Sequence, residues 1–470
     1  MKRLVTVQHC AVLLLSLLPA SVYALEVETA QELKFTASLD SLSWNGVGRR
    51  SYYSNIPLEE CSTVTLTSTE PGEKIAALYI VWAKIPGSWT LDYNGKSETY
   101  GQNGYLHEFV PVEGCAEEVS ITVQNSETVC FIRAFGSGVL PDDVQIWEPS
   151  CEKADILVLP THSDDEILFF GGVLALYAGQ RDLNVQVAYF SKYDHGIREH
   201  EKLDGIWTCG VRHYPVSGPF PDVFQGTPDQ AEAYYGTEKS MAFYMALLRR
   251  FRPQVCIIHD VTGEYGNGTH QFVVRILRQV LEQTADPSAC HESAESYGTW
   301  DVPKAYLHLW KENPIHLDCR QSLSAFGGKT ALEVATEAYK KHVTQQQYWF
   351  SVSDEDSYSI SDFGLYRTTV GPDTGDDIME HLIPYAQQEA ALVDSTEKEE
   401  TVPATTATEP APTQPAATEP TVAETLPEEP LSIREDPLSE RLLIPIAAVG
   451  GLMILVAVVA LCVLTFRKRS

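Results

Sequence analysis

Basic residues are scarce in this chain. Lysine and arginine together number 34 among 470 residues, against 64 aspartates and glutamates, so the formal net charge is −30 at pH 7. A surface this acidic repels the phosphates of nucleic acids and the head groups of anionic lipids. The composition therefore argues against a nucleic-acid partner.

Two kinds of binding signature are also missing. No Gly-x-Gly-x-x-Gly or P-loop pattern follows a candidate strand, which leaves nucleotide binding without support. No Cys-x-x-Cys pair occurs, so a zinc site built on thiolates is not expected. Eight cysteines nevertheless lie between the two apolar ends of the chain, and an even count in an exported protein favours disulfides. They are Cys61, Cys115, Cys130, Cys151, Cys209, Cys256, Cys290 and Cys319.

The two apolar ends indicate export and membrane anchoring. Lys2 and Arg3 precede an apolar run that closes on a small-residue pattern at Ala24, as in a secretory signal peptide spanning residues 1–24. Residues 442–466 are apolar and uncharged, long enough to form a transmembrane helix, and a basic cytoplasmic tail follows them. We expect a single-pass protein of the cell membrane with an extracellular ectodomain.

Composition divides the rest of the chain into three parts. Residues 25–150 contain short β-branched and aromatic runs separated by turn signals, which is typical of an all-β sandwich or jelly roll. Residues 151–390 alternate apolar runs with helical stretches, which predicts an α/β domain with a Rossmann-like parallel sheet. Residues 391–441 are rich in Pro, Thr, Ala and Glu and are expected to form a disordered stalk.

The first domain carries a local resemblance of its own. Strands are expected at 63–69, 75–83, 88–93, 118–124 and 128–135. Residues 131–149, FIRAFGSGVLPDDVQIWEP, resemble the end of a galactose-binding-like (discoidin-type) jelly roll. That resemblance implies a carbohydrate-binding accessory domain. The alternative is a packing module with Trp44, Trp82 and Trp89 in or near its core.

In the second domain, strands and helices alternate along the chain. Strands are expected at 156–160, 185–190, 254–260 and 304–310, and helices at 166–180, 198–210, 237–251, 271–283 and 331–349. The strands are continuous apolar runs, as expected when both faces of a sheet are covered by helices.

Polar residues follow two of these strands. His162, Asp164 and Asp165 come directly after the run ILVLP, and His270 closes a polar segment that begins at His259. The carboxyl ends of parallel strands are where open α/β sheets place their sites. Two imidazoles, one carboxylate and an open position describe a hydrolytic zinc site. Each segment alone has a structural explanation, so the prediction depends on the two together.

Four motifs resemble those of the PIG-L/LmbE-like zinc-dependent de-N-acetylases. PTHSDDE is similar to (A/P)HPDDE, HDVTGEYGNGTH to GEYGHxxH, REHE followed by CGV to RxxE…LGV, and AYKKHVTQ to AxxxHxSQ. They occur in this order over residues 154–385. The resemblance implies a hydrolase that removes acetyl groups from N-acetylated amino sugars or glycans with one zinc ion.

The resemblance also implies roles for single residues. The zinc ligands fall on His162, Asp165 and His270, and the general base falls on Asp164. The arginine that contacts the substrate falls on Arg198.

The resemblance implies catalytic roles at two further positions, of which only one departs from the family pattern. Tyr265 falls on the oxyanion side, and Asn267 stands where many members of the family have a second histidine. Asparagine can donate a hydrogen bond to an oxyanion but cannot carry a proton, so Asp164 would act as both base and acid. His259 and His342 could support the ligands or could be structural.

Two other functions remain open. The Asn267 substitution is compatible with a catalytically degenerate surface protein that binds glycans. The same zinc chemistry would also serve an amidase that acts on another acylated amine. The sequence does not name the sugar.

Overall fold

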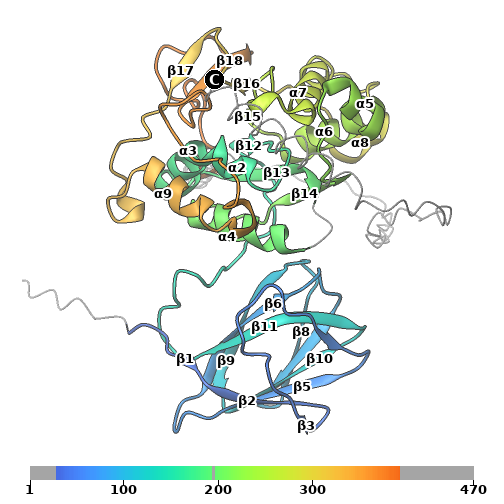
Figure 1. The fold of residues 1–470 in the computed structure, drawn as a ribbon, viewed down its shortest axis with the longest axis vertical. Coiled ribbons are helices and arrows are strands. Elements are labelled where there is room, and N and C mark those ends of the chain that lie inside the picture. Colours follow the sequence, from blue (N-terminus) through green and yellow to red (C-terminus); the bar gives the residue numbers. More distant parts are fainter. Residues whose placement is uncertain (1–27, 193–195, 392–470) are drawn as a thin grey trace, which may run out of the picture. The chain divides into compact units, whose positions relative to one another are not determined.

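Two antiparallel sheets form the first part of the chain. The computed structural model describes residues 28–192 and 196–391 (Figure 1). One sheet contains β1 (Glu32–Leu33), β11 (Glu127–Phe135), β6 (Ile75–Trp82) and β9 (His107–Ala116), with β4 (Ile56–Leu58) paired to β11. The other contains β3 (Leu42–Ser43), β2 (Phe35–Leu39), β5 (Thr63–Ser68), β10 (Glu118–Val123), β7 (Trp89–Tyr93) and β8 (Lys96–Tyr100).

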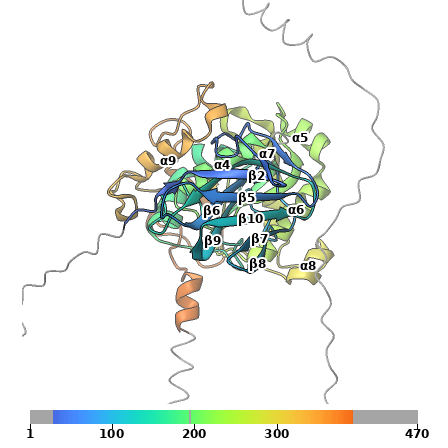
Figure 2. The ribbon, with the colours of Figure 1, turned by 90° about the horizontal axis from the view of Figure 1, so that it is seen from below.

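The inner faces of these two sheets share one core. Along β5, Val64 and Leu66 are fully buried, while Thr63 and Thr65, which alternate with them, are partly exposed and bond to hydroxyls of β10. Figure 2 shows β2, β5, β10, β7 and β8 side by side in this order. All five strands expected here are present, and Trp82 lies in the shared core. The jelly-roll topology itself stays a prediction.

A seven-stranded mixed sheet forms the centre of the second part. Its order is β14 (Val216–Pro221), β13 (Val185–Lys192), β12 (Ile156–Val158), β15 (Val255–Ile258), β16 (Lys304–His308), β18 (Asp362–Thr368) and β17 (Pro314–His316). The pairs from β14 to β16 are parallel, as expected. The pairs of β18 with β16 and β17 are antiparallel, so the expectation of an all-parallel sheet is corrected.

Helices cover both faces of this sheet. Along β12, Ile156 and Val158 pack into one core, and Leu157 packs into the core on the opposite face. The first core is covered by α2 (Asp165–Leu168), α3 (Gly171–Val173), the π-helical turn η1 (Leu174–Gln180), α4 (Ile197–Thr208) and α9 (Ala331–Tyr339). The second is covered by α5 (Pro228–Tyr235), α6 (Thr237–Phe251) and α7 (Gly268–Leu281), and α8 (His291–Tyr297) contacts α6 (Figure 1).

The expected helix at 166–180 is broken into α2, α3 and η1. At Gly171 a Cβ atom would lie 2.7 Å from Cβ of Ala335, and at Gly172 one would lie 2.6 Å from Sγ of Cys319. Glycines therefore allow α9 and the chain before it to pack closely here. The expected helix at 331–349 ends at Tyr339, because His342 leaves helical angles and contacts Glu166.

The expected disulfides are not present among the described residues, where all eight cysteines are free thiols. Three of these cysteines are buried in different parts of the fold, so they do not pair with one another. Cys256 is in β15, Cys209 follows α4 and Cys319 follows β17. Burial raises the pKa of Cys256 to about 12. Among residues 28–192 and 196–391, no helix is long and apolar enough to cross a membrane. The expected signal peptide, stalk and transmembrane helix lie outside this part of the chain.

The order of the strands indicates the edge of the sheet at which a functional site is expected. From β12 the chain adds β13 and β14 on one side, and β15 then pairs with β12 on the other side. Such a reversal leaves a crevice at the carboxyl ends of the two central strands, where α/β folds place their sites. The two polar segments singled out in the sequence follow β12 and β15.

Candidate metal centre

The segment after β12 turns sharply into α2. Asp164 stands at this turn with a φ of 135°, a value that L side chains rarely adopt. The backbone N–H of His162 donates to Asp165 Oδ2 at 2.7 Å, and that of Asp164 donates to Glu166 Oε2 at 2.7 Å. Two carboxylates therefore hold a strained turn at the end of a buried strand.

The segment after β15 is shaped to begin α7. Gly263 and Tyr265 both have positive φ values, 66° and 58°. Asn267 is the N-cap of α7, and its Oδ1 accepts hydrogen bonds from the N–H groups of Thr269 at 2.9 Å and His270 at 3.3 Å. Asparagine is among the best N-cap residues. The cap thus fixes the first turn of the helix that carries His270.

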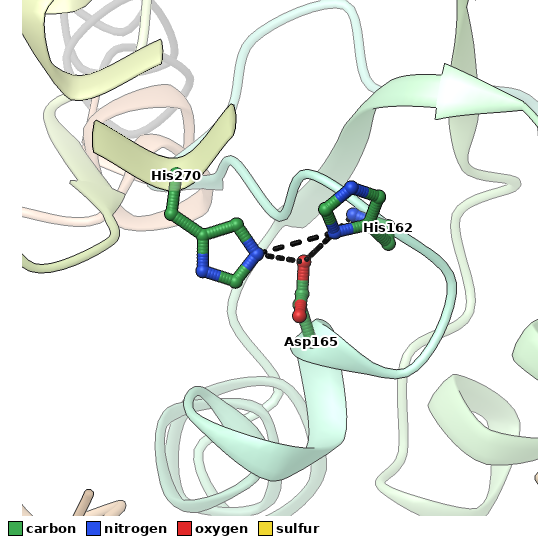
Figure 3. Close-up of side chains that lie close together, drawn as sticks. All are labelled: His162, Asp165 and His270. Atoms are coloured by element: carbon green, nitrogen blue, oxygen red, sulfur yellow. Dashed lines mark hydrogen bonds and ion pairs between the residues drawn. The ribbon is translucent and has the colours of Figure 1, made fainter. Parts of the chain in front are cut away.

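The three proposed ligands come together, as Figure 3 shows. Asp165 Oδ2 lies 3.1 Å from His162 Nδ1 and 3.2 Å from His270 Nε2, and those two nitrogens are 3.2 Å apart. All three side chains are buried. Two imidazoles and one carboxylate facing a common point form the donor set of hydrolytic zinc sites.

The electrostatics of this group also fit a bound cation. Burial alone would lower the pKa of His270, but the carboxylates of Asp165 and Glu264 outweigh burial and raise that pKa to about 10. Burial would raise the pKa of Asp165, and His270 and His162 together bring it well below the usual range. The buried carboxylates therefore require positive charge beside them. A divalent metal ion would supply that charge in place of a proton.

A buried carboxylate orients the ligand on α7. Glu264 lies within hydrogen-bonding distance of three imidazoles, at 2.8 Å from His259 Nδ1, 2.8 Å from His270 Nδ1 and 2.6 Å from His308 Nδ1. Its bond to Nδ1 leaves Nε2 of His270 for a metal. Nε2 of His259 accepts from the Thr161 N–H at 3.0 Å. Both nitrogens of His259 are thus engaged, which makes it a supporting residue.

The proposed base lies in a second charged group beside the ligands. Arg198 Nη2 donates to Asp164 Oδ1 at 2.9 Å, and Nη1 donates to Asp222 Oδ2 at 2.9 Å. Asp222 Oδ1 is in turn 3.9 Å from His162 Nε2. Burial raises the pKa of Asp164 to about 7, although Arg198 opposes this shift. A carboxyl that titrates near neutrality can both accept and donate a proton.

The remaining residues singled out in the sequence lie around this centre. His342 Nε2 is 2.7 Å from Glu166 Oε1, whose other oxygen binds the N–H of Asp164. The ring of Tyr265 is 5.8 Å from that of Phe169, which is 6.0 Å from the ring of His270. The functions of these residues remain predictions.

Sequence reasoning missed three residues of the site. Glu264 stands in the motif HDVTGEYGNGTH after β15, but the resemblance assigned no role to it. His308 ends β16 and reaches Glu264 from the neighbouring strand, a contact that its own sequence does not signal. Asp222 follows β14, whose sequence VSGPFP does not read as a strand because it contains proline and glycine.

Fold and site together define an α/β protein with a buried histidine–aspartate group suited to a divalent metal ion. No family model matches the chain. Curated relatives include 1D-myo-inositol 2-acetamido-2-deoxy-alpha-D-glucopyranoside deacetylase 1 of Catenulispora acidiphila, 25% identical over 188 residues, which cover 34% of this chain and 57% of that protein. Deacetylase 2 of Saccharopolyspora erythraea is 26% identical over 176 residues, covering 32% of this chain and 63% of that protein.

These relatives confirm the resemblance of the chain to the PIG-L/LmbE-like deacetylases. The chain spans 57% and 63% of the two relatives described. Among solved structures, the N,N'-diacetylchitobiose deacetylase from Pyrococcus horikoshii is 16% identical with a TM-score of 0.31, covering 41% of this chain and 71% of that chain.

Proposed function

We propose that this chain is a zinc-dependent de-N-acetylase of N-acetylated amino sugars or glycans. The observation that carries the proposal is the buried group of His162, Asp165 and His270 beside Asp164, whose pKa burial raises to about 7. Relatives whose names describe deacetylation of an acetamido sugar support this reaction for the chain.

The three ligands would hold the zinc ion, which supplies Lewis-acid polarisation of an amide carbonyl and lowers the pKa of water. Asp164 accepts the proton of the water that attacks the acetyl carbon. When the C–N bond breaks, Asp164 returns that proton to the amine nitrogen. Water and the amide thus become acetate and a free amino sugar, and the carboxyl ends as it began.

Three further side chains serve this reaction in the proposal. Arg198 holds the Asp164 carboxyl through its 2.9 Å bond and presents the same guanidinium to a substrate hydroxyl. The Tyr265 hydroxyl and the Asn267 Nδ2 group donate hydrogen bonds to the oxyanion of the tetrahedral intermediate. Removing one such donor from an enzyme costs about 3–4 kcal/mol of transition-state stabilisation. Asn267 would combine this role with its cap, because the cap uses only Oδ1.

The test is an amine-release assay on the full chain, with a panel of N-acetylated mono- and oligosaccharides and parallel zinc analysis. We expect release of amine and acetate in equal amounts from at least one sugar. A protein that holds zinc and binds sugar but releases no amine would instead be a glycan-binding relative. Release only from an acylated thiol conjugate or peptide would identify a different amidase.

We also propose, on sequence grounds alone, that the protein is anchored in the cell membrane by residues 442–466 with its ectodomain outside. Protease treatment of intact cells should then release the ectodomain. A protein protected from protease until the cells are lysed would contradict this location.

A further inference from the structure

An exposed aromatic surface lies next to the candidate metal centre. The side chains of Trp349 and Tyr348 are 74% and 53% exposed. The half-buried ring of Tyr265 meets Trp349 edge to face, with ring centroids 4.9 Å apart and planes at 83°. We call Tyr265, Tyr348 and Trp349 the aromatic platform.

The platform is continuous with the metal-binding residues. Tyr265 directly follows Glu264, which orients His270, and belongs to the segment that leads into α7. The ring of Phe169 lies 5.8 Å from Tyr265 and 6.0 Å from His270. Two ring contacts, both through the buried Phe169, therefore link the platform to a candidate ligand.

The aromatic platform is held in place by a packed ring, Phe350, and by hydrogen bonds of the preceding chain. Phe350 packs 4.9 Å from Trp349 and 4.7 Å from Tyr265. The chain that precedes it is anchored at Thr344, whose N–H and Oγ1 both donate to Glu201 of α4, at 2.8 and 2.6 Å. The exposed rings are thus presented by a held segment, so a ligand would meet them with little loss of conformational freedom.

The chemistry of the surface selects a neutral sugar ring. Exposed aromatic side chains that gather in one patch usually mark an interaction site. The negative face of an aromatic ring attracts the C–H face of a pyranose, which carries partial positive charge. Burial and the carboxylate of Asp356 raise the pKa of Tyr265, and this carboxylate together with a net charge of −30 disfavours an anionic ligand.

We propose that the aromatic platform is a stacking subsite for a second pyranose ring of the substrate, next to the ring that is deacetylated at the metal centre. This inference rests on the proposed function and narrows it, because it makes an oligosaccharide, rather than a free monosaccharide, the preferred substrate. Trp349 provides the stacking face, and Tyr265 connects it to the reacting end of the site.

The test compares N-acetylglucosamine with N,N'-diacetylchitobiose as substrates of the full-length protein and its variants. We expect Trp349→Ala to raise KM for the disaccharide roughly tenfold with kcat unchanged, the loss expected for one aromatic contact. KM for the monosaccharide should stay within about twofold. Trp349→Phe should restore most of the difference, whereas Trp349→Leu should behave like the alanine variant, because only Phe retains a ring face.

Tyr297→Ala is the matched control, since Tyr297 is an exposed tyrosine at the end of α8. It should leave both KM values unchanged. Equal effects of Trp349→Ala on the two sugars, or no effect on either, would overturn the subsite. A change in oligomeric state by sedimentation without a change in disaccharide KM would identify the platform as a contact between copies instead.

A binding measurement separates this proposal from the proposed function. Saturation-transfer NMR gives the Kd of each sugar without any reaction. If wild type turns over no acetylated sugar but binds the disaccharide through Trp349, the proposed activity fails and the subsite stands. If wild type turns over the disaccharide with a KM and Kd unaffected by Trp349→Ala, the activity stands and the subsite fails. If wild type binds neither sugar, both proposals fail.

Discussion

Two buried carboxylates of the same site, Glu264 and Asp164, have pKa values shifted in opposite directions. Burial alone would raise the pKa of both groups. Three imidazoles surround Glu264 and bring its pKa well below the usual range. Arg198, which Asp164 shares with Asp222, and His342 lower the pKa of Asp164 only in part, so it remains raised to about 7.

The difference separates a carboxylate that holds charge from one that moves a proton. Glu264 stays ionised at neutral pH and fixes the orientation of His270. Asp164 can change protonation near neutral pH, as the proposed base and acid must. Carboxylates whose surroundings push their pKa values apart are a recurring way to divide such roles. Each half of this comparison can be tested.

The largest effect is expected on zinc binding, at the ligands that lie beside both Glu264 and Asp164. We expect one zinc per chain in protein purified without chelators, and less than about a tenth of that in His162→Ala, because three ligands are the minimum for a stable site. Elemental analysis measures this. His316→Ala is the control, since His316 is exposed, its ring is bonded to Asp362 and its backbone N–H donates to Asp376. Full zinc in the His162 variant would exclude this ligand set.

The next largest effect concerns the proton. Asp164→Asn keeps the size of the side chain and the three ligands but removes the proton acceptor, so turnover should fall about 10²–10⁴-fold while zinc content persists. Asp260→Asn makes the same change at a nearby carboxylate that binds Thr262, and should change turnover little. The opposite pattern in the amine-release assay would move the base to Asp260.

A smaller effect is expected at Glu264, which touches no metal in the proposal. Glu264→Gln removes the charge that holds His270, so zinc affinity should fall about 10–100-fold. Competition with a chromogenic chelator measures the affinity. Glu282→Gln, an exposed position at the end of α7, should leave it unchanged. An unchanged affinity in the Glu264 variant would reduce Glu264 to a packing residue.

The same contrast explains what sequence alone could predict. The runs before His162 and His259 are apolar on both faces of the sheet, so the central strands and their polar ends were recognisable. His162, Asp165 and His270 were then expected at one edge, where they lie. Glu264 and His308 are 44 residues apart and meet only through the pairing of β15 with β16. Contacts of that kind have no local signal.

Helix ends were less predictable for a related reason. The pattern at 331–349 remains helical in composition, yet α9 ends at Tyr339. The chain turns so that His342 can contact Glu166, and the aromatic residues beyond it form an exposed surface instead of a core. Tertiary contacts at the site outweigh local helix propensity here.

The smallest predicted effect is a pH dependence of stability in the metal-free protein. Burial raises the pKa of Asp164 in the folded chain from an ordinary value of 3.8 to about 7. A raised pKa means that the folded state binds the proton more tightly, so this contribution to stability is fully present below about pH 4 and is lost as pH rises through 7.

The variant Asp164→Asn lacks this titrating carboxyl group. After removal of metal with a chelator, the Tm of Asp164→Asn minus that of wild type should therefore increase by a few degrees between pH 4 and pH 8. Glu264→Gln should show the opposite sign at lower pH, below about pH 4.5, because the lowered pKa of Glu264 stabilises the folded chain above the ordinary pKa of glutamate and that contribution disappears on further acidification. Thermal unfolding followed by circular dichroism provides the measurement, and parallel pH profiles for the two variants would show that both carboxylates are held in the same state.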